Sequence, residues 1–266
     1  MKISRGGITL FLFFILFGSS LLSWEIHVKP GPWGNVKTNE IERVLESTTQ
    51  VFLPHVSIWK HKNITVSHSM DKPRILYGSG KNKEIKIQLS ARDRYWCQYA
   101  FQFSHELGHL MCGYKRGDLT NQWFEESVAE TASLFALAKL EEIWTVSPPF
   151  QSWRPYAIEF TKYRNQRILK SSYPENFQLS SWWKQNRQTL SNHSQLRKQN
   201  LWVAIKLYDL FSQNPDFGWR ALGWLNHKKM NSSKDFEQYL QDWKNSCPEV
   251  EQKQFVEQVS KLFGLS

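Results

Sequence analysis

One segment constrains the fold of this chain more than any other, because it combines a helical apolar pattern with two histidines four residues apart. Its apolar residues recur at spacings of three and four, which predicts one buried helix face: Trp96, Ala100, Phe103, Leu107, Leu110 and Met111. Asp93 is the predicted N-cap of this helix, and Gly113 is predicted just past its end. His105 and His109 fall on a different face of this helix, outside its predicted apolar contact.

The pentapeptide His105-Glu106-Leu107-Gly108-His109 has the form HExxH. Residues i and i+4 of a helix project from the same side one turn apart, so two imidazoles can bind one metal ion. Two His and a carboxylate suit zinc, which leaves a fourth position open for water. Glu106 lies beside this face, where it can accept a proton from that water. The pattern predicts one Zn²⁺ per chain, with Glu106 as the catalytic base.

A third ligand is expected from the acidic segment at 123–130. Sixteen residues separate His109 from Glu126, enough for the chain to turn and bring a second helix alongside. Glu125 and Glu126 both compete for the role, but only Glu126 has a further acid, Glu130, one turn later. Because a ligating His usually donates its second N–H to a carboxylate, carbonyl or water, we predict Glu126 as the ligand and Glu130 as the acid that holds a ligating His.

The sequence HELGH followed by WFEESVAE resembles the gluzincin branch of zinc metallopeptidases. It is most similar to the peptidase-MA-like group, in which HExxH precedes a W-x-x-E-G-x-A-E segment. The resemblance gives His105, His109 and Glu126 to the metal, Glu106 to catalysis and Glu130 to the acid one turn on. It covers only about residues 101–135. Ser127 stands where many relatives have Gly, a change that spares every ligand.

This resemblance implies a zincin-like α+β fold with a small N-terminal lobe, a mostly helical C-terminal lobe and a cleft between them. The small lobe would carry a short mixed sheet and the HExxH helix. The implied activity is zinc-dependent hydrolysis of peptide bonds, in which zinc polarises the scissile carbonyl and Glu106 moves a proton from water to the amine. Endopeptidase action is preferred over aminopeptidase action, because no exopeptidase anchor such as GxMEN is present.

Two further features of such enzymes can be sought in this sequence: a residue that stabilises the oxyanion and a strand that borders the cleft. Relatives often use a Tyr or His of the second lobe to stabilise the oxyanion, and the candidates are Tyr156, Tyr163, Tyr173, His193 and Tyr208. The alternating segment 85–89 directly precedes the motif helix and predicts a half-buried strand. In folds of this kind such a strand forms the edge of the cleft, where an extended peptide substrate can add by main-chain hydrogen bonds.

The rest of the chain predicts short strands first and helices afterwards. Strands are expected at 64–66 and 74–77, followed by a turn at 78–80, and 30–34 is expected to be irregular. Helices are expected from 40 to 52 with Asn39 as its cap, from 121 to 140, 156 to 169, 181 to 190 and 196 to 212, and as a pair from about 233. This order favours an α+β class, with one domain at 24–266 and lobes at about 24–113 and 114–266.

Residues 1–23 have the composition of a secretory signal peptide, with a basic start, an apolar run and small residues at a cleavage position. We therefore expect a secreted, periplasmic or extracellular protein, with an uncleaved N-terminal membrane anchor as the alternative. Three Cys allow at most one disulfide. Cys97 and Cys112 lie at opposite ends of one predicted helix, roughly 22 Å apart, so a bond from Cys247 to either is the remaining possibility.

The chain carries a formal net charge of +10, which attracts anionic partners, but its basic residues are scattered and predict no nucleic-acid module. The expected partner is a peptide or protein substrate. Thirteen Trp residues favour core packing over a stacking surface. Two alternatives stay open: a zincin fold without catalysis, and a basic Trp-rich protein that binds envelope or polysaccharide. The intact Glu106 argues against the first, because a structural site needs no base.

Overall fold

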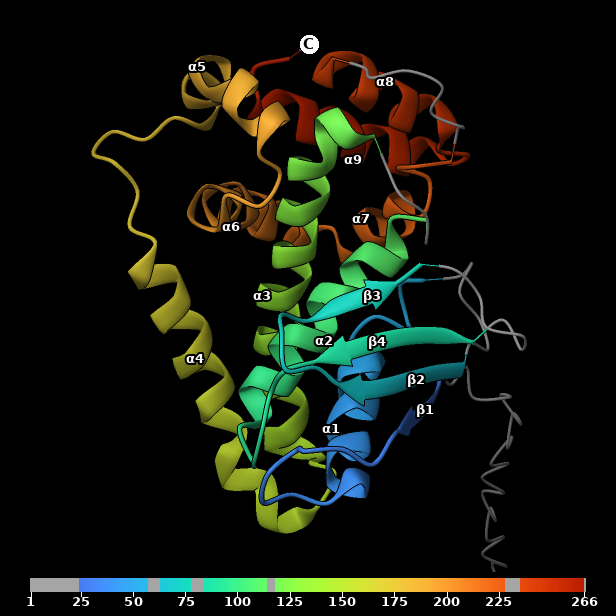
Figure 1. Cartoon of the computed structure of the whole chain (residues 1–266). Helices are drawn as coiled ribbons and strands as arrows, with labels where there is room; N and C mark the ends of the chain where they lie inside the picture. Colours follow the sequence, from blue (N-terminus) through green and yellow to red (C-terminus); the bar gives the residue numbers. More distant parts are fainter. Residues whose placement is uncertain (1–23, 57–62, 78–83, 114–117, 228–234, 266) are drawn as a thin grey trace, which may run out of the picture.

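The computed structural model describes residues 24–56, 63–77, 84–113, 118–227 and 235–265. Within these residues the chain is an α+β protein with nine α-helices, two 3-10 helices and one four-stranded sheet (Figure 1). The α+β class predicted from the sequence is confirmed. The predicted signal peptide at 1–23, the predicted turn at 78–80 and residue 233 lie outside the described residues.

Short strands precede most of the helices in chain order. The strands are β1 (Glu25–Val28), β2 (Asn63–His68), β3 (Arg74–Leu76) and β4 (Ile85–Leu89). The α-helices are α1 (Thr38–Gln50), α2 (Trp96–Met111), α3 (Gln122–Val146), α4 (Ala157–Lys170), α5 (Leu179–Asn192), α6 (Arg197–Gln213), α7 (Pro215–Leu222), α8 (Phe236–Ser246) and α9 (Val250–Leu262). The 3-10 helices are η1 (Leu119–Asn121) and η2 (Gln151–Tyr156).

The sheet is mixed and has the strand order β1-β2-β4-β3. β1 and β4 both pair in parallel with β2, and β3 pairs antiparallel with β4, with Ile75 opposite Ile87. Ile85, Ile87 and Leu89 are buried, as the alternation at 85–89 predicts. The prediction that this strand forms the edge of the cleft is wrong, because β4 lies between β2 and β3. Among the described strands, β3 is the edge strand on this side of the sheet.

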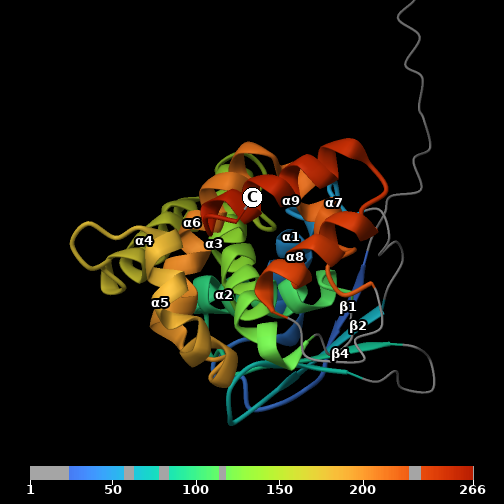
Figure 2. The ribbon, with the colours of Figure 1, turned by 90° about the horizontal axis from the view of Figure 1, so that it is seen from above.

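The helices lie in layers on one face of the sheet. α1 and α2 pack against the strands, and α3 packs against α2 on the side away from the sheet. Figure 2 shows this order, with the strands along one side of the molecule and the C-terminal helices on the other. α3 is the central helix: it also contacts α4 and α6, and its residues Phe124, Val128, Thr131, Ala132 and Phe135 are buried as predicted.

The motif helix α2 begins later than predicted. Asp93 is not its N-cap: the helix starts at Trp96, and Asp93 has a positive φ of 51° in the preceding turn. Its Oδ1 accepts a hydrogen bond from the main-chain N of Asn35 at 2.7 Å, so this carboxylate joins two loops instead of capping a helix. Gly113 ends the helix with a φ of 104°, which glycine adopts without strain.

Three other local predictions differ from the structure. α1 starts at Thr38 with Lys37 as its N-cap, two residues before the predicted start at 40 and the predicted cap, Asn39. β1 and α7 were not predicted, and α3 runs to Val146 instead of 140. β1 has only four residues and a half-exposed pattern, and α7 has only eight, so neither has a long periodic segment.

The aromatic residues build the core, as the composition favoured. Nine Trp side chains are buried: Trp24, Trp33, Trp96, Trp123, Trp144, Trp183, Trp202, Trp219 and Trp243. All three cysteines are buried free thiols, so the suggested disulfide from Cys247 is wrong. Among the described residues, no helix has both the length and the apolar character that a transmembrane span requires.

Candidate metal centre

The two helices that carry the acidic and imidazole side chains cross at unusually close range. A Cβ atom added to Gly108 would lie 2.6 Å from the Cα of Ala129 and 3.2 Å from its Cβ. Only a glycine permits this approach, because the obstacle is the main chain of α3 and cannot rotate away. The glycine inside HELGH therefore has a mechanical role: it brings the histidine face of α2 against the first turns of α3.

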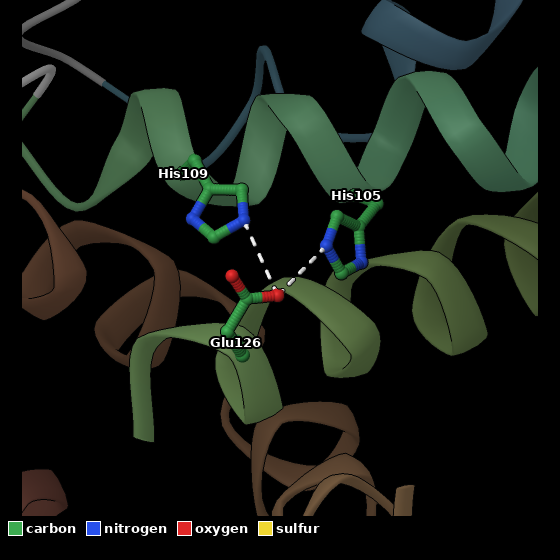
Figure 3. Close-up of side chains that lie close together, drawn as sticks. All are labelled: His105, His109 and Glu126. Carbon is green, nitrogen blue, oxygen red and sulfur yellow. Dashed lines mark ion pairs between the residues drawn. The ribbon is translucent and has the colours of Figure 1, made fainter. Parts of the chain in front are cut away.

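The three predicted ligands come together at this crossing. His105 and His109 project from α2 toward Glu126 on α3, and one carboxylate oxygen lies between the two rings (Figure 3). The Nε2 atoms of His105 and His109 lie 3.5 and 3.8 Å from Oε2 of Glu126. One ligand atom from each residue lies within 4.8 Å of the others. This group could hold a metal ion.

The outer nitrogens of both imidazoles face further carboxylates. Nδ1 of His109 lies 3.0 Å from Oε1 of Glu125, and Nδ1 of His105 lies 3.6 Å from Oε2 of Glu130. With Nδ1 engaged in this way, Nε2 of each ring is the nitrogen left for a metal ion. Such acid–imidazole pairs fix the tautomer and orientation of a ligating His. The donor set therefore fits a divalent ion, and two imidazoles with one carboxylate are the set that zinc takes in open sites.

Glu125 and Glu126 have different contacts in the structure, although both were candidates for the third ligand in the sequence. Glu126 faces both imidazoles, while Glu125 is buried and holds His109 from outside. Nδ2 of Asn226 donates to Oε2 of Glu125 at 3.1 Å, and the Tyr239 hydroxyl donates to Oδ1 of Asn226 at 3.1 Å. Sequence reasoning missed these three roles, because no spacing pattern links α3 to residues about a hundred positions later.

Glu130 is held in place by a cation as well as by His105. Nη2 of Arg167 on α4 lies 3.1 Å from Oε1 of Glu130. The same guanidinium lies over the ring of Phe101, 3.9 Å from its centroid. The Glu130 side chain is 11% exposed and the Arg167 side chain 33%, so packing as well as charge holds this partly buried pair. Arg167 was not predicted, and its position 37 residues after Glu130 gives no local signal.

Without a metal ion, protons and hydrogen bonds compensate the crowded acids. Burial by itself would lower the pKa of His105, but its contacts with Glu126 and Glu130 outweigh burial and raise it to about 10. Burial would raise the pKa of Glu126, yet the His105 hydrogen bond and the charge of His109 lower it to about 2. A dication at this point would replace the protons in balancing the same carboxylates.

Glu106 lies beside the two candidate ligands of α2 and contacts the main chain of the edge strand β3. Its side chain is buried, and this burial raises the pKa of its carboxyl group. The charges of His105 and His109 and a hydrogen bond from the main chain of Ile75 on β3 act in the opposite direction. The hydrogen bond from β3 orients the carboxylate beside the histidines.

Glu106 opens onto a cavity of about 350 Å³ that also exposes His105, Glu126 and Glu130. Residues from before and after position 113 line it, including Lys72 and Gln195. Nε2 of Gln195 donates to Oε1 of Glu126 at 3.2 Å. Two of the three predicted ligands, His105 and Glu126, therefore border the same space as Glu106, and this space is large enough for part of a peptide.

Among the five oxyanion candidates, Tyr163 alone lines this cavity. The hydroxyls of the other tyrosines are engaged elsewhere: Tyr156 with the main-chain N of Cys97, Tyr173 with the carbonyl of Trp202, and Tyr208 with Arg164. His193 lies exposed at the end of α5.

Ser127, the departure from the W-x-x-E-G-x-A-E pattern, is buried and takes no part in the site. Its hydroxyl donates to the Trp123 carbonyl at 2.8 Å, within α3. Asn200 on α6 donates to the same carbonyl at 2.9 Å, which ties the start of α3 to α6. The serine therefore belongs to the packing between these helices.

Comparison with known proteins adds no relative to this picture: no protein-family model, no curated protein and no solved structure matches the chain.

Proposed function

We propose that this chain is a zinc-dependent metallopeptidase of the gluzincin type, with a zincin-like fold. One observation carries the proposal: Nε2 of His105, Nε2 of His109 and a carboxylate oxygen of Glu126 converge, and His105 and Glu126 line an open cavity together with a buried glutamate, Glu106. A purely structural zinc site is normally closed by four protein ligands. Here there are three candidate ligands, and two of them, His105 and Glu126, line a cavity. This arrangement favours a catalytic site over a structural one.

His105, His109 and Glu126 would hold the metal, and Glu125 and Glu130 would fix the two imidazoles from outside. When bound, zinc supplies Lewis acidity toward a carbonyl group and makes water reactive at neutral pH. Glu106 is placed to accept a proton from water and to deliver it to the departing amine.

The substrate in this proposal is an extended peptide that adds to the outer edge of β3. β3 takes the substrate-binding role that was predicted for the strand at 85–89. Among the described strands, β3 pairs only with β4, so its other edge is available for a peptide. Ile75 joins the strand to Glu106 through its main chain, so an added peptide would pass beside the base. Edge addition uses main-chain hydrogen bonds and tolerates many side chains, which suits an endopeptidase.

The two competing functions have less support. The Trp-rich binding protein would need exposed aromatic faces, whereas nine Trp side chains lie in the core. The non-catalytic zincin would need neither Glu106 nor the cavity beside it. We also propose an extracytoplasmic location, on the basis of the apolar run and small residues within 1–23.

The test is peptide cleavage by the mature protein and its Glu106→Gln variant, with zinc content measured on both samples. Loss of general base catalysis should lower turnover of an unstructured protein such as casein by at least about a hundredfold, while zinc stays bound. Glu142→Gln, a change at an exposed acid on α3, is the matched control and should keep full turnover. Equal turnover by the wild type and Glu106→Gln would refute the proposal.

A further inference from the structure

The cavity beside the candidate metal centre has two cations that the centre does not use. Its acids are Glu106, Glu126 and Glu130, and all three have roles at the proposed metal site. Arg167 is the counterion of Glu130. Lys72 and Arg197 remain, and neither is paired with a carboxylate of the described residues.

Lys72 reaches the cavity from the loop between β2 and β3. Its Nζ donates to Oε1 of Gln195 at 2.8 Å, so its hydrogen-bond partner is a neutral amide and not a carboxylate. The contact crosses from the sheet side of the cavity to the loop between α5 and α6. The contact places Lys72 beside Gln195, which precedes Arg197 by two residues. Both cations line the cavity.

Arg197 is the first residue of α6, and no acidic residue lies in that first turn. A cation at this position does not stabilise the helix, because the helix dipole favours anions at the N-terminus. Lys198 carries the same charge in the same turn, but its ammonium lies over the ring of Trp202, 5.5 Å from the centroid. Arg197 has no comparable partner among the described residues, and it faces the cavity instead.

The rest of the lining is polar rather than apolar. Gln98, Gln102, Ser90 and Asn200 supply amide and hydroxyl groups, and the lining residues with apolar or aromatic side chains are Pro73, Phe101 and Tyr163. A large apolar substrate side chain would find little to pack against here. A carboxylate would meet two unpaired cations and neutral donors, an arrangement that gives charge-assisted hydrogen bonds.

We infer that Lys72 and Arg197 bind a carboxylate of the peptide substrate close to the scissile bond. The inference rests on the proposed peptidase function for its substrate class. The carboxylate has two chemical sources, an Asp or Glu side chain or the C-terminus of the peptide. The first source makes the protein an endopeptidase with acidic preference, and the second directs cleavage toward chain ends.

The experiment measures binding and cleavage separately, on the full mature protein. Binding uses fluorescein-labelled peptides and the zinc-loaded Glu106→Gln protein, read by anisotropy and repeated after zinc removal with a chelator. One peptide has an internal Glu and an amidated C-terminus, the second has Gln and a free C-terminus, and the third has Gln and an amidated C-terminus. Cleavage of the same three peptides is measured with the wild type.

A carboxylate peptide should bind about tenfold more tightly than the neutral peptide, and the metal-free protein should keep part of this preference. Lys72→Gln and Arg197→Gln should each reduce the preference by about two- to fivefold, as for an exposed ion pair. Lys198→Gln removes the same charge from the neighbouring residue and should leave the preference unchanged. At about 1 M salt, where the Debye length is ~3 Å, the preference should largely disappear.

Equal binding of all three peptides, or equal loss in Arg197→Gln and Lys198→Gln, would overturn the inference. Cleavage of all three peptides at one rate would also overturn it while leaving the peptidase function intact. Binding that depends on the carboxylate and on Arg197, without cleavage of any peptide, would support the carboxylate site and count against the peptidase. Tighter binding of an anionic polysaccharide such as polygalacturonate than of either carboxylate peptide would overturn the assignment to a peptide.

Discussion

Substituting Gly108 by alanine tests whether the close crossing of α2 and α3 builds the metal centre. The new Cβ would lie 2.6 Å from the Cα of Ala129, whereas carbon atoms in contact prefer about 3.5–4.0 Å. The helices must therefore separate by roughly 1 Å at this point. Overpacking of this kind costs about 1–3 kcal/mol, and the better helix propensity of alanine returns about 1 kcal/mol. We expect a net loss of about 1–2 kcal/mol in unfolding free energy.

The larger effect should fall on metal binding, because Glu126 precedes Ala129 by less than one turn on α3. Moving α3 away lengthens its distances to His105 and His109, now 3.5 and 3.8 Å, and zinc affinity should fall at least about tenfold. Denaturant unfolding and zinc titration against a competing chelator measure the two effects.

Gly218→Ala is the matched control for this substitution. Gly218 lies inside α7, and its new Cβ would meet the Phe255 ring of α9 at 2.9 Å. Neither residue lines the cavity beside the proposed ligands. It should reduce stability and leave zinc affinity unchanged. Wild-type zinc affinity in Gly108→Ala, or an equal loss of affinity in both variants, would refute the reasoning.

Three further predictions concern the groups around the proposed ligands. Asn226→Ala removes the amide that donates to the buried Glu125, so unfolding free energy should fall by about 1–3 kcal/mol in denaturant titration, and an unchanged midpoint would contradict this role. Glu130→Gln removes the carboxylate charge that faces Nδ1 of His105, so zinc affinity measured by competition titration should drop about 10- to 100-fold. An affinity within twofold of wild type would count against this role of Glu130. Removing zinc with a chelator should lower the melting temperature, since a metal at about a thousand times its Kd adds ~4 kcal/mol; Glu126→Ala should show no such shift.

The sequence predicted the parts of the molecule that depend on local periodicity. The apolar spacing from Trp96 to Met111 and the alternation of Ile85, Ile87 and Leu89 each place residues on one face, and both elements were confirmed. The spacing of His105 and His109 could be interpreted in the same way, because four residues make about one helical turn.

The rest depended on contacts between distant segments, which local periodicity does not encode. Asn226 and Arg167 meet Glu125 and Glu130 only because α3 packs beside their segments. Strand order is another such property. The apolar alternation at 85–89 is the same for an edge strand and for an inner strand, and in the sheet β3 pairs with the outer side of β4.

The most direct test of the account is zinc per chain in the purified mature protein, measured beside Glu126→Ala after both are grown with ample metal. A single three-ligand site should hold about one zinc in the wild type and little or none in the variant. No zinc in the wild type, or the same amount in both proteins, would contradict it.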